Sequence, residues 1–220
     1  MVSEGRTVPV AVLGALDLLL TSVVDALRSR GYDVAHIPRP RTSPEFGRAK
    51  PGVLIVDVDP PGAVRAVAHA ASAGWTVVAV GSGDERDKAA AAVVAGAQEW
   101  IGKDSPFGAI VEAVSAGVAG SLRMSDERRA QWHELHRGVE LARAARMERL
   151  MSLSRREVEV LCHLVDGRRA AEIARSLFVS LATVRTHIRS ILTKLEVNSQ
   201  KHAVALYREG APPASGGAGD

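Results

Sequence analysis

The sequence predicts two folded regions of different class: an α/β doubly wound parallel sheet over residues 1–120 and an all-helical domain over residues 151–210. Two observations lead to this prediction. In the first region, apolar runs of strand length alternate with helical segments, which is the pattern of a parallel sheet covered by helices. In the second region, short segments with helical periodicity are separated by turn and cap residues.

Five strands are expected in the first region. The run VLIVDV is the expected central strand, because a strand that is buried on both faces is apolar almost throughout. Ligands of such sheets bind at the carboxyl ends of the strands, so polar residues at those ends are candidate site residues. The expected strands are Val8–Leu13, Tyr32–Ile37, Val53–Val58, Thr76–Val80 and Glu99–Ile101.

Helices are expected after most of these strands. Residues 38–52, between the second and third strands, carry four prolines and two glycines. Proline disrupts helix interiors, so the second helix of the region should be short or missing. A solvated loop is the favoured interpretation of this segment, and the alternative is a lid over the strand ends or an extra contact to an anion. The expected helices are Leu16–Arg30, Pro61–Ala73, Glu85–Ala95 and Pro106–Ala119.

Residues 121–150 are rich in Arg, Glu, Ala and Leu, which predicts a helical linker between the two regions. Trp132, Leu135, Val139 and Ala142 lie at near-helical spacing within it. This stripe either packs on the first region or pairs with a second chain. The final segment, APPASGGAGD at residues 211–220, predicts a disordered tail.

The second region has clear helix boundaries. Ser154 and Glu157 form an S-x-x-E capping box, and Gly167 is placed to end the helix that follows. Phe178 and Val179 are expected to fill a later turn. The predicted helices are Arg155–Val165, Ala170–Leu177, a segment N-capped by Ser180 that runs to about Leu195, and a last one capped by Asn198 or Ser199 that ends at Tyr207.

The helix that follows Ser180 has two faces. Arg185, Thr186 and Arg189 lie on one side. A cationic face on a helix that is anchored by its other side is what insertion into a DNA major groove requires. The anchoring residues follow the spacing of a buried stripe and are Val184, Ile188, Ile191 and Leu195.

The segment Leu153–Arg208 resembles the LuxR-type (GerE) helix-turn-helix domain of NarL/FixJ-like transcription regulators. The motifs LSRREVEVL, AEIA, VSLATVRTHIRSILTKL and KHAVA occur in order at the family's spacing. The resemblance implies binding to double-stranded DNA as a homodimer, with RNA polymerase as a further candidate partner. It implies base contacts by Arg185, Thr186 and Arg189 and phosphate contacts by Ser180, Thr183, Lys194 and Lys201. The alternative for this segment is a small helical bundle that binds another protein.

The first region is similar to a response-regulator receiver domain, a CheY-like or flavodoxin-like fold. The motifs LIVDVDPPG and AGAQEWIGKD and the spacing between them carry this resemblance. It implies that Asp57 matches the phosphoacceptor, for which a histidine kinase would be the partner. Lys103 matches the lysine that binds the phosphoryl group, and Trp100 matches an aromatic switch residue.

The same region departs from the receiver pattern. Gly14 and Ala15 stand where a receiver has the acidic pair that holds Mg²⁺, and the nearest acid, Asp17, is expected to lie too far along the next helix. Gly81 stands where a Thr or Ser is usual, with Ser82 beside it. Mg²⁺ prefers several oxygen ligands, so weak Mg²⁺ binding and an atypical receiver, or pseudo-receiver, are predicted. No cofactor is expected, and a small molecule is a candidate effector.

Composition sets the remaining bounds. Residues 121–220 carry 17 Lys and Arg against 12 Asp and Glu within a chain of net charge +3, so the positive excess lies in the half with the DNA-binding motifs. The single cysteine, Cys162, excludes an internal disulfide. The start of the chain has no signal-peptide pattern and no apolar run is long enough to span a membrane, so we expect a cytoplasmic protein.

The leading hypothesis is a sequence-specific transcription regulator whose atypical receiver controls dimerisation or DNA binding without conventional phosphorylation. One alternative is a conventional two-component regulator phosphorylated on Asp57. Another is an α/β small-molecule sensor that acts through a protein partner. An enzyme is not expected, because the sequence has no Walker-type loop, no nucleophile elbow and no histidine set with metal-ligand spacing.

Overall fold

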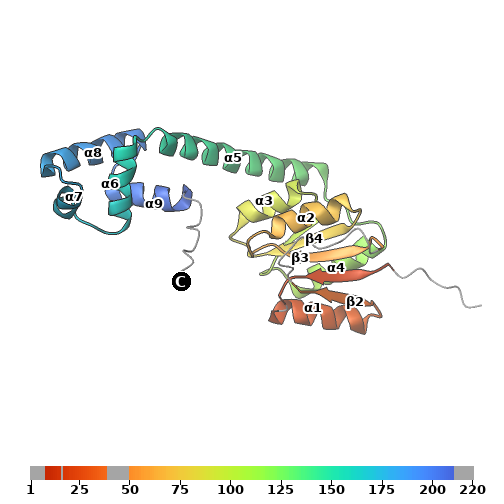
Figure 1. Ribbon diagram of the computed structural model, residues 1–220. Coiled ribbons are helices and arrows are strands. Elements are labelled where there is room, and N and C mark those ends of the chain that lie inside the picture. Colours follow the sequence, from red (N-terminus) through yellow and green to blue (C-terminus); the bar gives the residue numbers. More distant parts are fainter. Residues whose placement is uncertain (1–7, 16, 39–49, 211–220) are drawn as a thin grey trace, which may run out of the picture. The chain divides into compact units, whose positions relative to one another are not determined.

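The computed structural model describes residues 8–15, 17–38 and 50–210. The chain divides into two compact units, residues 1–138 and residues 139–220, which are described separately below. The first unit is the α/β part and the second is helical (Figure 1). The predicted fold classes are therefore confirmed for both parts of the chain.

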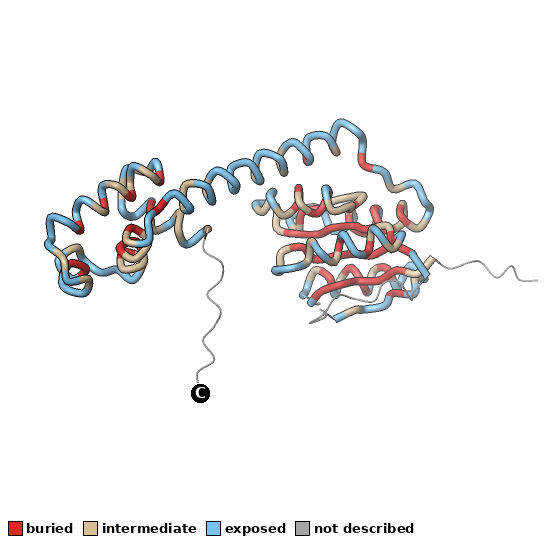
Figure 2. Tube along the Cα trace, turned by 45° about the horizontal axis from the view of Figure 1, so that its top comes forward, coloured by how far each residue is buried: buried red, intermediate tan, exposed pale blue. Residues whose placement is uncertain are grey.

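The first unit contains a five-stranded parallel sheet in the order β2-β1-β3-β4-β5. Strand β2 lies on one side of β1, and β3, β4 and β5 follow on the other side. The order in which strands are added therefore reverses between β1 and β3, which makes the sheet doubly wound. As predicted, β3 lies at the centre and is buried along its whole length (Figure 2). The strands are β1 (Val10–Leu13), β2 (Val34–Ile37), β3 (Val53–Asp57), β4 (Thr76–Gly81) and β5 (Glu99–Gly102).

Alternate strand residues face opposite sides of the sheet and belong to two separate cores. Ile55 contributes to the core shared with α1 and α4, while its neighbours Leu54 and Val56 contribute to the core shared with α2. Burying such a side chain contributes roughly 1.5–3 kcal/mol. The helices of the first unit are α1 (Leu18–Ser29), α2 (Ala63–Ser72), α3 (Arg86–Val94) and α4 (Phe107–Val118).

Helix α5 (Asp126–Met151) begins in the first unit and ends in the second. These residues are helical, as the sequence predicts, but residues 121–125 are not. The Ser125 hydroxyl accepts a hydrogen bond from the backbone of Arg128 at 3.2 Å, so the helix starts there. Trp132 is buried against Val93 and Met124 of the first unit, whereas Ala142 at the other end of the stripe is exposed. The stripe therefore packs on the first unit at its beginning.

The second unit holds four further helices around one apolar core. Its capping box is formed as predicted: Glu157 donates its backbone N–H to Ser154 Oγ, and its carboxylate accepts from the Ser154 backbone. At the last helix it is Ser199 whose hydroxyl accepts from the His202 backbone. The helices are α6 (Arg155–Val165), α7 (Ala170–Ser176), α8 (Leu181–Lys194) and α9 (Gln200–Gly210).

One expectation about the turn between α7 and α8 is wrong. Val179 packs on the apolar core, but the Phe178 side chain is 95% exposed and does not fill the turn. Two other expectations, on the missing second helix of the sheet region and on the disordered tail, fall on residues 39–49 and 211–220, which lie outside the described residues. Within the part of the chain that is described, none of the helices has the length and apolar character needed to cross a membrane.

Candidate nucleic-acid interface and carboxylate pocket

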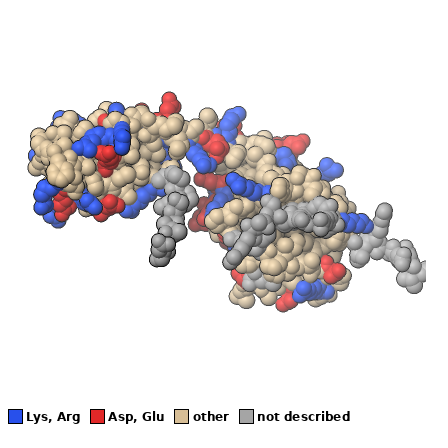
Figure 3. Space-filling view, in the orientation of Figure 1, with Lys and Arg blue, Asp and Glu red and all other residues tan. Residues whose placement is uncertain are grey.

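Helix α8 has the two faces that its sequence predicts. Its stripe of Val184, Ile188 and Ile191 is buried in the core of the second unit. Arg185 and Arg189 lie exposed on the other side, and in the described part of the chain neither guanidinium group forms a hydrogen bond or an ion pair. Lys and Arg side chains occur in several groups on the visible face of this unit (Figure 3). The helix therefore presents free cations on a rigidly anchored scaffold.

The first turn of α8 presents hydroxyl groups at its surface. Ser180 caps the helix, because its Oγ accepts from the Thr183 backbone at 3.0 Å. The two hydroxyls are 2.8 Å apart, and the Thr186 hydroxyl donates to the carbonyl of Ala182 at 3.1 Å. All of these residues are exposed. The N-terminus of a helix carries partial positive charge, so this end of α8 is suited to a phosphate group.

Two lysines complete the predicted set, and they lie in different surroundings. Lys201 is exposed on α9. Lys194 instead donates to the Glu157 carboxylate at 2.7 Å and to the carbonyl of Ser152 at 3.2 Å. The free amine that a phosphate contact needs is therefore present at Lys201, whereas the amine of Lys194 binds a carboxylate of the same unit.

Glu157 was predicted only as a capping residue, and the structure gives it a second role. Its side chain is buried, which by itself raises the pKa of the carboxyl. Hydrogen bonds from Lys194, from Ser190 at 2.6 Å and from Ser154 at 2.6 Å outweigh the burial and lower the pKa to about 2. Glu157 therefore joins α6 to α8 and fixes the orientation of the exposed face. The sequence signal was the capping-box motif, which reveals only one of its two oxygens.

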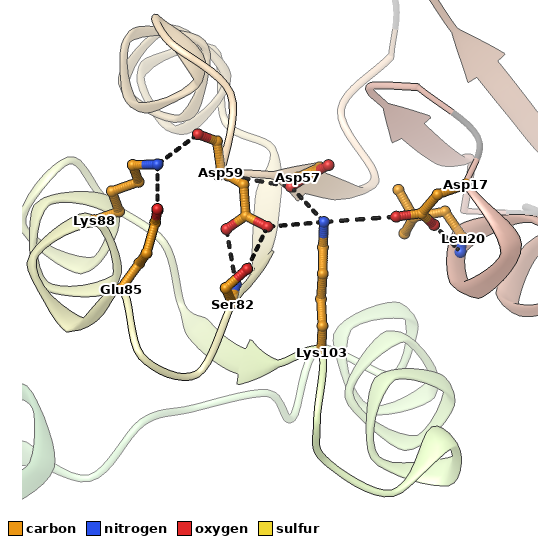
Figure 4. A network of polar contacts seen from close by, with 8 residues as sticks. All are labelled: Asp17, Leu20, Asp57, Asp59, Ser82, Glu85, Lys88 and Lys103. Atoms are coloured by element: carbon orange, nitrogen blue, oxygen red, sulfur yellow. Dashed lines mark hydrogen bonds and ion pairs between the residues drawn. The ribbon is translucent and has the colours of Figure 1, made fainter.

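In the first unit, Lys103 lies among three carboxylates at the carboxyl ends of the strands (Figure 4). Its Nζ is 2.9 Å from Asp59 Oδ2, 3.1 Å from Asp57 Oδ1 and 3.6 Å from Asp17 Oδ2. Burial alone would lower the pKa of Lys103, but the bonds to Asp59 and Asp57 raise it. The ammonium is therefore held charged and offsets part of the negative charge of the three carboxylates.

Asp59 was not among the predicted site residues. Its carboxylate accepts from the Ser82 backbone at 2.7 Å and from the Ser82 hydroxyl at 2.8 Å, in addition to Lys103. Lys88 donates to the Asp59 carbonyl at 2.6 Å. Burial raises the pKa of Asp59, and these bonds from Ser82 and Lys103 lower it overall. The signal for Asp59 was in the sequence, since it lies two residues after Asp57 at the end of the same strand.

The expectation that Asp17 lies too far from the pocket is wrong. Asp17 caps α1, with Oδ1 accepting from the Leu20 backbone at 2.8 Å, and this leaves Oδ2 to approach Lys103. Gly14 has a backbone φ of +138°, a conformation that side-chain-bearing residues rarely adopt, and a Cβ there would lie 3.2 Å from Asp57 Cβ. A carboxylate at position 14 would therefore need a different backbone.

The Mg²⁺ ion of typical receivers does not fit these residues. The ion needs several oxygen ligands in near-octahedral arrangement. Here the carboxylate of Asp59 is taken up by Ser82 and Lys103, and Asp57 Oδ1 binds both Lys103 and the Asp59 backbone. Among the described residues there is no group of three His, Cys, Asp or Glu side chains able to hold a metal. The pocket is built around an ammonium group.

Trp100 lies on β5 and contacts α5. Its ring meets that of Trp132 edge to face, with centroids 5.5 Å apart, and Arg86 lies over the Trp132 ring at 5.7 Å. Arg128 adds bonds to Glu99 and to the Trp100 carbonyl. The predicted switch residue, Trp100, therefore packs on the beginning of α5. Lys103 directly follows the same strand.

Residues 151–207 match the family model described as bacterial regulatory proteins, luxR family. The transcriptional regulatory protein LiaR of Bacillus subtilis (strain 168) is 33% identical over 121 residues, which are 55% of this chain and 55% of that protein. The nitrate/nitrite response regulator protein NarP of Escherichia coli (strain K12) is 34% identical over 117 residues, 53% of this chain and 52% of that protein. The match thus spans about half the length of these curated relatives.

Among solved structures, response regulator ChrA of a heme-sensing two-component system is 25% identical, with 92% of this chain and 97% of that chain covered and a TM-score of 0.45. The relatives are transcriptional and response regulators, a class of protein that is not enzymatic. The similarity to the luxR family of bacterial regulatory proteins thus lies in residues 151–207.

Proposed function

We propose that this protein is a transcription regulator that binds double-stranded DNA in a sequence-specific manner through α8. The observation that carries this proposal concerns the guanidinium groups of Arg185 and Arg189, which are exposed and have no partner among the described residues, on a helix whose opposite face is buried. Arg can bind the O6 and N7 atoms of guanine with two hydrogen bonds, and the methyl group of Thr186 can contact that of thymine. The luxR-family match of residues 151–207 supports the same function.

Contacts to the DNA backbone are assigned to the residues around this face. Ser180 and Thr183 place hydroxyls at the N-terminus of α8, and Lys201 adds a free ammonium. Such contacts fix the register of a protein on DNA without reading its sequence. Lys194 is retained as a weaker candidate, because it would have to leave Glu157 to reach a phosphate. Binding is proposed to be that of a homodimer on two half-sites, with RNA polymerase as a candidate further partner.

The first unit is proposed to control this activity without conventional phosphorylation. In this account residues 1–120 form an atypical receiver, 121–150 the linker and 151–210 the DNA-binding domain. The support is the pocket, in which Lys103 is already paired with Asp57 and Asp59 and the Mg²⁺ that phosphoryl transfer requires does not fit. The two candidate modes of control by this unit are the binding of a small molecule and constitutive dimerisation.

The test begins with a duplex selected by the wild-type protein from a random DNA library. Its affinity and that of a shuffled duplex are measured by fluorescence anisotropy over a range of salt concentrations. The proposal predicts strong preference for the selected duplex and a steep loss of affinity with salt. Equal, salt-insensitive binding to both duplexes would contradict it and would favour a helical module that binds a protein partner.

The control of the protein is tested with the same duplex. Asp57→Asn and wild type are compared with and without Mg²⁺ and a small phosphodonor. We expect all affinities to agree, because the donor has no metal-loaded pocket to act on. A rise in affinity that requires both the donor and Asp57 would establish the conventional phosphorylation switch instead.

A further inference from the structure

Five of the described helices end in the same way, at a glycine with positive φ. A helix often ends with a residue in the left-handed conformation, and glycine adopts it without a steric penalty. These glycines and their φ angles are Gly31 (85°), Gly74 (85°), Gly96 (111°), Gly120 (72°) and Gly167 (78°), which follow α1, α2, α3, α4 and α6.

Helix α7 ends with the same backbone geometry but without glycine. The backbone N–H of Val179 donates to Ala174 at 3.0 Å, and that of Phe178 donates to Arg175 at 3.3 Å. These are the two hydrogen bonds of a Schellman motif, and they place Phe178 at the position that favours glycine, with a φ of 55°. A large aromatic residue is therefore held in a strained conformation.

Helix α8 also ends in a Schellman motif without glycine. There the residue that replaces glycine makes a contact within the chain. Glu196 has a φ of 56° and lies at the matching position. Its carboxylate binds Arg149 at 3.1 Å and thereby joins the end of α8 to α5. Strain at Glu196 thus accompanies a contact that a glycine could not make.

Phe178 has no comparable compensation within the described part of the chain. The apolar contact that usually accompanies a Schellman motif is made by its neighbour Val179, which packs with Ala174 in the core. The Phe178 ring itself is 95% exposed. A strained residue that makes no compensating contact among the described residues points to a contact outside the fold.

We propose that Phe178 is a DNA-contact residue whose ring packs against the deoxyribose and thymine-methyl surface beside the N-terminus of α8. It lies two residues before Ser180, the N-cap of α8, so it borders the end of the helix that is proposed to enter the major groove. Phenylalanine makes apolar contact with thymine methyl groups in such grooves. This inference rests on the proposed DNA-binding function.

Charge favours DNA over a protein as the partner of Phe178. Residues 173–195 contain no Asp or Glu, and their cations are Arg175, Arg185 and Arg189, together with Lys194, which is paired with Glu157. The Phe178 ring therefore lies in a segment whose charged side chains are all positive, and such a segment attracts a polyanion. A second copy of this chain would bring the same cations face to face.

The test uses Phe178→Gly together with Glu196→Gly, because both substitutions relax the same backbone strain in the same unit. Thermal unfolding and anisotropy titrations on the duplex selected by the wild-type protein are measured for each. We expect Phe178→Gly to raise the Tm by roughly 4 °C and to lower the affinity for the duplex roughly tenfold. Glu196→Gly should not weaken DNA binding. Phe178→Asn, which also tolerates this conformation, should show the same loss of affinity.

The possible failures are distinguishable. Wild-type affinity in Phe178→Gly, with the Tm raised, would overturn the assignment of Phe178 and leave the proposed function intact. Loss of self-association in sedimentation, with unchanged affinity per bound protein, would overturn it in favour of a second copy of the chain. A wild-type protein that does not distinguish the selected from a shuffled duplex would instead overturn the proposed function, and this inference with it.

Discussion

The cations of the two units lie in opposite electrostatic surroundings. Lys103 in the first unit lies within 4.0 Å of three carboxylates. Arg185 and Arg189 in the second unit are exposed and form no ion pair in the described part of the chain. Only the second kind of cation can bind phosphates without first breaking an internal bond. The first unit is therefore proposed to hold a closed, metal-independent pocket, and the second a DNA-binding surface.

Lys194 is the informative exception, because it belongs to α8 but resembles Lys103 in having a carboxylate partner. Its bond to buried Glu157 contributes to the fold of the second unit and not to a free surface. The comparison therefore separates cations by their contacts and not by the helix that carries them.

The largest effect is expected at Glu157. Glu157→Gln should destabilise the second unit by about 3 kcal/mol, because the buried carboxylate loses the bonds that hold its pKa near 2. A lowered folded-state pKa means that this stability is present above about pH 4.5 and is lost as the pH falls toward 2. Urea unfolding between pH 2 and 7 measures it. The exposed Glu196→Gln is the control, and an equal loss there would remove the special role of Glu157.

Arg189→Ala tests the free cations. We expect a loss of roughly 1–3 kcal/mol on the selected duplex, because a contact to a base edge disappears, and a smaller loss on a shuffled duplex. Arg143→Ala is the matched control. Arg143 is also an exposed arginine, but it belongs to α5 and not to the proposed base-reading helix. Equal losses on both duplexes would show that Arg189 binds phosphate and reads no base.

Lys103→Met tests the internal cation. Removing the ammonium leaves the three carboxylates facing one another, so the first unit should lose about 1–2 kcal/mol. Millimolar Mg²⁺ should then raise the Tm of the variant, while the Tm of the wild type stays unchanged. Lys201→Met, which removes an exposed ammonium, should respond to Mg²⁺ as the wild type does. A wild-type Tm that rises with Mg²⁺ would contradict the account of a closed pocket.

The smallest effect is expected at Asp57. Asp57→Asn should bind the selected duplex as tightly as the wild type, with or without a phosphodonor, because Asp59 keeps its bonds to Ser82 and Lys103. Anisotropy titrations measure this directly. A donor-dependent change in the wild type that disappears in the variant would place control back on Asp57.

Much of the fold follows from local sequence rules. The strands, the capping box at Ser154 and the buried stripe of α8 were predictable, because each depends on periodicity or on residues close in sequence. The exposed face of Arg185 and Arg189 follows from the same periodicity. These predictions needed no knowledge of how distant segments meet.

The errors arose where the outcome depends on contacts between distant segments. Asp17 reaches Lys103 because the end of β1 and the turn after β5 meet at one sheet edge, and Asp59 joins them through Ser82. Lys194 meets Glu157 because α8 crosses α6. Phe178 was expected to fill a turn, but it has a positive φ and is 95% exposed. Spacing in sequence does not reveal such encounters.

The most direct test of the central claim is the salt dependence of binding for wild type, Arg189→Ala and Lys103→Met on the selected and shuffled duplexes. The account predicts that Arg189→Ala loses its preference for the selected duplex, while Lys103→Met keeps both the preference and the salt slope of the wild type. Loss of preference in Lys103→Met with an unaffected Arg189→Ala would contradict the account, because it would place the functional cation in the pocket of the first unit.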